Sequence, residues 1–290
     1  EFDTAKDMVL KLIDFCKAKK SMPFVVFKPT GFGRFYLYEK LGKGEQLTEK
    51  EQIEWNKIVE RFDLVCKKAK KYDVAVLIDG EESWMQDAAD ALVTSMMQKY
   101  NTEKPIVYNT LQMYRHDRLA FLKNELEKAK TGNYHLGFKL VRGAYMEKEN
   151  KRANEKGYLS PICKSKKETD LNFNTSLNFI LDNLEDISIV AGTHNEESSY
   201  LLMELMQKKG LQNNDSSVWF AQLYGMSDHI SFNLSNNGYN VAKYIPFGPV
   251  KDVMPYLIRR AEENTSVSGQ TNRELNLLNQ EKKRRKTDRM

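Results

Sequence analysis

One stretch near the carboxyl end gathers side chains that could grip a small carboxylate. The sequence predicts a helix that begins near Pro249 or Pro255, and the spacing i, i+3, i+4, i+7 puts four polar or aromatic side chains on one of its faces: Tyr256, Arg259, Arg260 and Glu263. Two neighbouring guanidiniums can each donate two parallel hydrogen bonds to a carboxylate. A solvated face in which Glu263 pairs with Arg259 has the same spacing, so the pattern alone leaves both interpretations open.

The opposite face of this helix is apolar. We expect it to be buried, and it comprises Val250, Val253, Met254, Leu257 and Ala261. A strand over residues 241–245 and a turn through Pro246 and Gly248 are predicted to lead into the helix.

Short apolar runs that alternate with amphipathic helical patterns must position these groups. The runs predict buried strands at 23–28, 74–79, 106–112, 136–143, 187–195, 218–224 and 241–245. The helical patterns include a first helix capped by Thr4 or Asp7, a long helix opened by the capping box Thr48–Glu51, and helices over 86–100 and 115–130. This alternation favours parallel βα units, and their number favours a (βα)8 TIM-like barrel. Because the predicted strands number one fewer than a closed barrel needs, we expect the first strand to be missing from this chain.

Polar residues fall at or near the carboxyl ends of these strands, where barrels place their chemistry. The positions are Lys28, Asp79, Gln112, Arg142, His194, Gln222 and Tyr244. Each one alone could cap a loop, but their shared register predicts a site on this rim.

Length and composition narrow the function classes. A chain of 290 residues, 41% hydrophobic and with a net charge of +5, is typical of one ordinary globular domain rather than a dedicated nucleic-acid binder. Its cysteines, Cys16, Cys66 and Cys163, are isolated, which argues against a disulfide framework and favours a reducing compartment. No apolar run approaches the roughly 20 residues that span a bilayer.

Dinucleotide-binding and metal-binding motifs are incomplete in this sequence. The pair Gly31 and Gly33 lacks the third glycine and the acidic residue of a dinucleotide-binding fold. The histidines have no metal-ligand spacing, so no metal is expected.

Lys28 at a strand end could form a Schiff base, and a lyase that uses it stays open as an alternative. The run Lys282–Arg289 follows a predicted helix with a capping box at Thr271–Glu274; we expect a frayed, solvated tail, and its functional alternative is contact with anionic lipid.

An ordered set of motifs between residues 24 and 264 resembles the proline dehydrogenase family. The set comprises Phe27-Lys-Pro-Thr-Gly-Phe-Gly33, Leu77-Ile-Asp-Gly-Glu-Glu82, Gln112-Met-Tyr114, Lys139-Leu-Val-Arg-Gly-Ala-Tyr145, Gly192-Thr-His-Asn195, Gln222-Leu-Tyr-Gly-Met226 and Tyr256-Leu-Ile-Arg-Arg260. The resemblance implies a (βα)8 barrel that holds non-covalent FAD at the strand ends. On this basis residues 1–264 would be an N-terminally incomplete proline dehydrogenase barrel, and 265–290 a C-terminal helix with a basic tail.

The same resemblance implies three sets of site residues. The substrate would be bound by Lys28, Leu223, Tyr244, Tyr256, Arg259, Arg260 and Glu263. Catalytic positions would be Asp79, Tyr145 and Tyr244. The flavin and its phosphates would be held by Gln112, Lys139, Arg142, Gly143, Thr193, His194, Asn195 and Gln222.

The implied activity is oxidation of L-proline to Δ1-pyrroline-5-carboxylate by hydride transfer to FAD, with the electrons passed to a quinone. This would suit a cytoplasmic bacterial protein at the periphery of the inner membrane, with the matrix side of the mitochondrial inner membrane as the alternative. Two rival activities remain open besides the Lys28 lyase. One is a 4-hydroxyproline dehydrogenase, against which the bulky Tyr244 argues; the other is a basic surface-binding module whose affinity for nucleic acid would collapse with salt.

Overall fold

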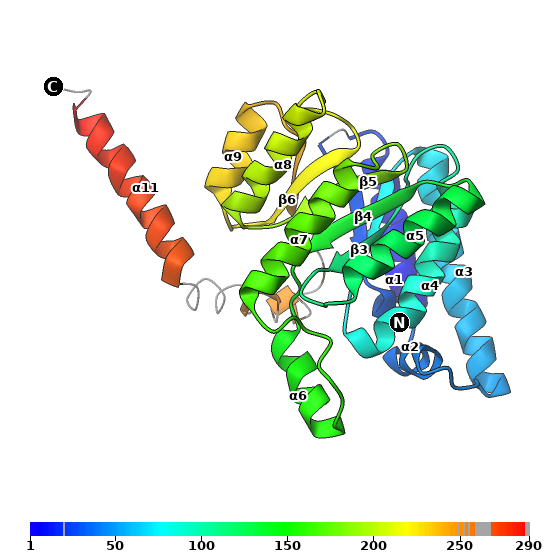
Figure 1. Ribbon diagram of the computed structural model, residues 1–290. Helices are drawn as coiled ribbons and strands as arrows, with labels where there is room; N and C mark the ends of the chain where they lie inside the picture. The colour runs from blue at the N-terminus through cyan, green and yellow to red at the C-terminus, as the bar shows by residue number, and fades with distance from the viewer. Residues whose placement is uncertain are drawn as a thin grey trace.

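Seven parallel strands form one sheet in the order in which they occur along the chain (Figure 1). The computed structural model describes residues 1–19, 21–246, 248, 250–251, 253–254, 256–258 and 268–287. The strands are β1 (Phe24–Phe27), β2 (Ala75–Ile78), β3 (Val107–Gln112), β4 (Leu136–Val141), β5 (Ile187–Gly192), β6 (Val218–Leu223) and β7 (Val241–Tyr244). Sequential order with every neighbour parallel is the topology of a βα barrel, whereas a doubly wound sheet reverses its order at a switch point.

The sheet is curled, because side chains from distant strands meet on its inner face. The rings of Phe24 on β1 and Trp219 on β6 are 5.0 Å apart and edge-on, although four strands separate β1 from β6 in the sheet order. A small buried cluster of Leu77, Tyr108 and Val190 fills the same interior. Figure 1 shows β3, β4, β5 and β6 bending around this space. The predicted α/β barrel-like fold is therefore confirmed.

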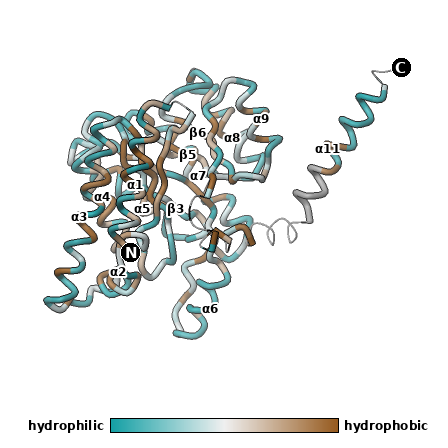
Figure 2. Tube along the Cα trace, turned by 180° about the vertical axis from the view of Figure 1, so that it is seen from behind, coloured by the Kyte–Doolittle hydropathy of each residue, from teal (hydrophilic) through white to brown (hydrophobic). Residues whose placement is uncertain are grey.

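Helices cover the outer face of the sheet and bury the larger core against it. They are α1 (Phe2–Cys16), α2 (Phe35–Gly42), α3 (Glu49–Tyr72), α4 (Ser83–Tyr100), α5 (Arg118–Gly132), α6 (Met146–Lys156), α7 (Lys166–Leu181), α8 (Glu196–Lys208), α9 (Asp228–Asn236) and α11 (Ser268–Thr287), together with the 3₁₀ turn η1 (Pro29–Gly31). Figure 2 shows apolar residues along the strands and on the helix faces turned toward them, with polar residues outside.

A local signal places the start of α3. The predicted capping box is formed: Glu51 N donates to Thr48 Oγ1 over 3.4 Å and Thr48 N donates to Glu51 Oε2 over 2.7 Å. The expected cap at Thr4 or Asp7 is wrong, because α1 already begins at Phe2 and both residues lie inside it. Helices α2 and α9 are short and were not predicted.

Two expectations near the carboxyl end are also corrected. The described positions between 250 and 258 are helical, but Val250 is 76%, Met254 43% and Leu257 47% exposed, so the expected burial of this apolar face is wrong for them. Ala261 lies outside the described residues. The basic run does not fray before Thr287: α11 includes Lys282–Lys286, whose side chains are exposed.

Candidate active site

Four of the predicted residues meet in two pairs at the rim formed by the carboxyl ends of the strands. Lys28 directly follows β1, and its Nζ donates to the hydroxyl of Tyr145, at the start of α6, over 3.2 Å. Tyr244 ends β7, and its hydroxyl donates to Oδ2 of Asp79, which follows β2, over 3.1 Å. Residues far apart in sequence are thus brought together as the strand-end pattern predicts.

Lys139 joins this group, although the resemblance assigns it to the flavin. It lies on β4, its ammonium forms an ion pair with Oδ1 of Asp79, and its Nζ lies 5.7 Å from the centre of the Tyr244 ring. The Asp79 carboxylate therefore has one oxygen on a cation and the other on a phenol. Lys139 connects the predicted substrate residues with the predicted flavin residues.

Electrostatics fix the charge states of two of these groups. Burial disfavours the charged form of Lys28, but the Tyr145 hydroxyl and the carboxylates of Glu81 and Asp79 outweigh it and raise the Lys28 pKa. Burial, and next the Asp79 carboxylate, raise the pKa of Tyr244 well above its ordinary value. Lys28 is therefore a cation and Tyr244 a neutral hydrogen-bond donor at physiological pH.

The remaining predicted substrate residues divide between described and undescribed positions. Leu223 ends β6 half-buried and pairs in register with Tyr244. The ring of Tyr256 is 6.3 Å from that of Tyr244, with an angle of 32° between the planes. Arg259, Arg260 and Glu263 lie outside the described residues.

A second group surrounds the end of β5. The guanidinium of Arg142 donates to Thr193 Oγ1 over 2.8 Å and to Ser198 Oγ over 2.9 Å. Asn195 caps α8, because its Oδ1 accepts from Ser198 N over 2.8 Å. The cation, the hydroxyls and the first amides of α8 thus lie together, an arrangement that suits phosphate groups.

Two further predicted residues brace this group. Gln222 on β6 is buried; its Nε2 donates to the carbonyl oxygen of Thr193 over 3.1 Å, and its Oε1 accepts from Ser231 over 2.9 Å. His194 Nδ1 lies 3.0 Å from Ser227 Oγ. The structure therefore brings Arg142, Thr193, His194, Asn195 and Gln222 to one part of the rim.

Gln112 and Gly143 lie between the two groups. Gln112 ends β3 and is buried, yet its Oε1 has no hydrogen-bond partner among the described residues. A buried amide oxygen left without a donor is costly, and an N–H group of a bound ligand would satisfy it. Gly143 has φ +129°, and a Cβ there would come within 2.5 Å of the Tyr114 ring, so only glycine fits. The unpartnered oxygen of Gln112 fits the flavin that the resemblance implies, whereas Gly143 is required by the close approach of Tyr114.

Glu81 also belongs to the site, although it is not among the residues predicted from the sequence. Its buried carboxylate accepts from Thr30 Oγ1 over 2.8 and 2.7 Å, which ties the segment after β2 to the turn after β1. Burial raises the pKa of Glu81, while Lys28 and Thr30 act in the opposite direction. The sequence feature that could have indicated Glu81 is its position two residues after Asp79, in the run Asp79–Glu82.

Asp170 and Ser198 were also not identified. Asp170 Oδ1 accepts from Arg142 Nε over 2.7 Å and so helps to orient that guanidinium. Its contact crosses from α7 to the end of β4, and no spacing in the sequence reveals such a pair.

Within the described part of the chain, no cluster of three or more His, Cys, Asp or Glu could hold a metal, and none of the helices there is long and apolar enough to cross a membrane.

Comparisons with known proteins show what the whole chain resembles. A profile described as "Proline dehydrogenase" matches residues 3–273. The chain is 37% identical over 285 residues to the carbapenem antibiotics biosynthesis protein CarD of Pectobacterium carotovorum subsp. carotovorum, covering 98% of this chain and 73% of CarD. It is 38% identical over 236 residues to the human mitochondrial proline dehydrogenase 1, covering 80% of this chain and 39% of the human protein.

Among solved structures, the chain resembles proline utilization A (PutA) from Bdellovibrio bacteriovorus with a TM-score of 0.81 and 21% identity, covering 92% of this chain and 29% of PutA. At this identity the likeness concerns the fold. The chain spans well under half the length of the human relative and of PutA.

Proposed function

This chain belongs to the proline dehydrogenase family, and from this premise we propose that it oxidises L-proline at the carboxyl ends of its strands, with FAD as the hydride acceptor. The observation that carries the proposal is the convergence on one part of the rim of Lys28, Asp79 and Tyr244 from separate strand ends and of Tyr145 from the start of α6. Oxidation of a C–N bond needs an acceptor that no side chain supplies, so the protein must position the amino acid against a cofactor.

The residues available for FAD are those around β3, β4 and β5. Gln112 offers the unpartnered amide oxygen, Arg142 a cation, and the segment Thr193–Asn195 hydroxyl, imidazole and amide groups beside the start of α8. When bound, FAD supplies the hydride acceptor for the reaction. Lys139 lies between this group and Asp79, where its charge would stabilise electron density that develops on a neighbouring ring.

Cationic side chains indicate where the proline carboxylate would bind. Lys28 is a fixed cation at the rim, and the family resemblance adds Arg259 and Arg260 as a clamp for the proline carboxylate, with Glu263 to orient one of them. Leu223, Tyr244 and Tyr256 would wall the pyrrolidine ring. Holding the carboxylate in this way fixes which carbon faces the acceptor, and such an orientation effect is worth several kcal/mol.

The product follows from the atoms that leave. Loss of a hydride from carbon and a proton from the ring nitrogen gives the C=N bond of Δ1-pyrroline-5-carboxylate. The electrons would then pass to a quinone. The exposed basic side chains of α11, Lys282–Lys286, would bind an anionic membrane surface, where this electron transfer would take place. Flotation with anionic liposomes tests the membrane contact, and absence of binding removes it.

A visible absorption spectrum tests the proposed function. The purified protein should be yellow, and addition of L-proline without oxygen should bleach it. A colourless protein that borohydride traps with a carbonyl substrate would instead support a Schiff-base lyase at Lys28. Protein that binds flavin but does not bleach with proline would refute the proposed substrate.

The preference for proline over 4-hydroxyproline rests on Tyr244. Its hydroxyl is held by Asp79, so the ring cannot easily turn away to admit a substituent on the substrate. Comparison of kcat/KM for the two amino acids decides between them. A preference for 4-hydroxyproline would overturn this assignment.

A further inference from the structure

Helix α6 is attached to the barrel mainly by polar contacts. It follows Tyr145 directly and projects from the rim in Figure 1. Two of its residues, Glu149 and Ala153, are buried. An amphipathic helix is usually held by an apolar stripe, and α6 lacks one. The position of α6, and of Tyr145 at its start, must therefore depend on polar contacts.

Glu149 makes the most buried of these contacts. Its side chain is fully buried, Oε1 accepts from Ser83 N over 2.6 Å and Oε2 accepts from Ser83 Oγ over 2.6 Å. Ser83 is the first residue of α4, whose N-cap Glu82 makes no side-chain cap hydrogen bond. Glu149 thus supplies from another helix the acceptor that the first turn of α4 needs, and its charge suits the positive end of the α4 dipole.

The contact lies between two parts of the proposed substrate site. On α6, Glu149 N donates to the carbonyl oxygen of Tyr145 over 2.9 Å, so Glu149 is one helical turn from the phenol that accepts from Lys28. On the other side, Ser83 follows Asp79 by four residues. The carboxylate of Glu149 therefore connects the segment that carries Tyr145 to the segment that carries Asp79.

Other polar contacts of α6 are more exposed. Lys148 pairs with Glu82, and 61% of the Lys148 side chain is exposed. Arg152 pairs with Glu39 over 2.5 Å, with one quarter of its side chain exposed. Ion pairs that water and salt can reach contribute little. Glu149 is thus the contact best placed to hold α6.

We propose that Glu149 is a positioning residue, which holds Tyr145 against Lys28 by fixing α6 to the amino end of α4. This inference rests on the proposed function, because Tyr145 matters only if the substrate binds beside it. Glu149 itself does not touch the substrate. Its loss should weaken substrate binding in the ground state and the transition state alike, which raises KM and leaves kcat nearly unchanged.

The test compares Glu149→Met with Glu147→Met, using the holoenzyme and steady-state kinetics with L-proline, normalised to bound flavin. Methionine preserves the length of the side chain but accepts no hydrogen bond from Ser83. Glu147 lies on the same helix, is exposed and takes no part in the rim contacts described above. We expect KM to rise about tenfold in Glu149→Met with kcat within about twofold, and both constants to stay within about twofold in Glu147→Met.

Glu149→Gln provides the conservative comparison, because one oxygen remains for Ser83 N and the hydroxyl of Ser83 can turn to accept from the amide. It should recover most of the loss in KM. Equal KM values in Glu149→Met and Glu147→Met would overturn the proposal. A loss of flavin or kcat without a change in KM would also overturn it, since that is what a purely structural role predicts.

Misfolding of Glu149→Met and failure of the proposed function can each be distinguished from failure of the positioning role. If Glu149→Met does not fold, Ser83→Ala carries the test, because it removes one of the two hydrogen bonds to Glu149; an unchanged KM in this variant would refute the positioning role, and a raised KM would support it. If the wild-type flavin is not bleached by proline, the proposed function fails and the inference fails with it. Bleaching of the wild type together with a normal KM in Glu149→Met, or in Ser83→Ala if that variant replaces it, refutes the inference alone.

Discussion

The hydroxyl of Tyr244 donates to Oδ2 of Asp79 over 3.1 Å and so connects the end of β7 with the segment after β2. The other Asp79 oxygen is paired with Lys139 on β4. Three strands that are not neighbours in the sheet order therefore meet at one carboxylate. The curl of the sheet makes this meeting geometrically feasible, and the hydrogen bond helps to hold the rim in that shape.

The first prediction concerns that hydrogen bond. Tyr244→Phe removes the hydroxyl and keeps the ring, so Asp79 retains Lys139 but loses a neutral donor. We expect kcat/KM for proline to fall about tenfold, since a hydrogen bond to a charged group contributes about 1.5–3 kcal/mol. Tyr239→Phe is the matched control, because Tyr239 packs its ring against Phe220 away from Asp79. Equal kcat/KM in the two variants would show that the contact is not used.

The second prediction concerns the pH dependence of turnover. Lys28 stays cationic because its pKa is raised, and Tyr244 stays neutral because its pKa is raised too. Neither group changes charge between about pH 6 and 9. Hydride loss needs the free lone pair of the substrate amine, so kcat/KM should rise with pH toward the pKa of that amine.

Glu81 is the described rim carboxylate whose titration could imitate this rise, because burial raises its pKa. In Glu81→Gln the group cannot titrate. The rising limb should therefore persist in this variant, measured as the slope of log(kcat/KM) against pH. A flat profile in the wild type would contradict the role of the amine, and loss of the limb in Glu81→Gln would assign it to the enzyme.

The third prediction concerns flavin binding. Gly143→Ala places a Cβ about 2.5 Å from the Tyr114 ring in addition to the strain of φ +129°. Because Gly143 follows Arg142 at the predicted flavin site, we expect the purified variant to lose most of its visible absorbance per protein. Gly157→Ala is the control: its φ is +72°, and nothing lies within 4 Å of the new Cβ. It should cost about 1 kcal/mol of stability and keep the flavin; a fully yellow Gly143→Ala would contradict the prediction.

The sequence predicts the strands well because each is a short apolar run that must be buried on both faces of a covered sheet. The run 187–195, for instance, contains β5 (Ile187–Gly192) and places Thr193, His194 and Asn195 just beyond it. Helices α2 and α9 were missed because they have only 8 and 9 residues, too few for periodicity to stand out. The burial of the 250–257 face was wrong because periodicity shows that a face is apolar but not which segment covers it.

The strand-end rule also explains which site residues were predictable. Lys28 and Asp79 directly follow strands and Tyr244 ends one, so their meeting follows from the topology. Glu149 and Ser83 lie on different helices, 66 positions apart, and no local pattern in the sequence pairs them. Such contacts depend on how the helices pack, which propensity and spacing do not determine.

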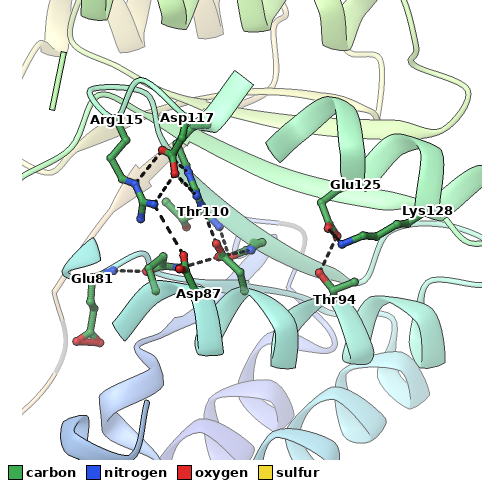
Figure 3. A network of polar contacts seen from close by, with 12 residues as sticks. Glu81, Asp87, Thr94, Thr110, Arg115, Asp117, Glu125 and Lys128 are labelled. Carbon is green, nitrogen blue, oxygen red and sulfur yellow. Dashed lines mark hydrogen bonds and ion pairs between the residues drawn. The ribbon is translucent and has the colours of Figure 1, made fainter. Parts of the chain in front are cut away.

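The final prediction concerns a charged network behind the rim (Figure 3). Asp117 accepts hydrogen bonds from Arg115 over 3.0 and 2.6 Å and from Arg118 over 3.0 and 2.7 Å. Burial opposes the charge on Asp117, but the two guanidiniums outweigh it and hold the pKa of this carboxyl far below its usual value. A carboxyl with a depressed folded-state pKa adds stability above its unfolded pKa of about 3.9, and this stability is lost as pH falls.

Asp117→Asn should therefore lower the free energy of unfolding at pH 7, and the difference from wild type should shrink as pH falls below about 4. We expect a difference of only about 1–2 kcal/mol, because 39% of the Asp117 side chain is exposed and solvent screens the pairs. Urea unfolding at several pH values measures it. Asp87→Asn is the control, since Asp87 is 65% exposed and lies 3.8 Å from Arg115, and it should change stability by less than about 0.5 kcal/mol. A difference for Asp117→Asn that stays constant with pH would mean that its charge does not stabilise the fold.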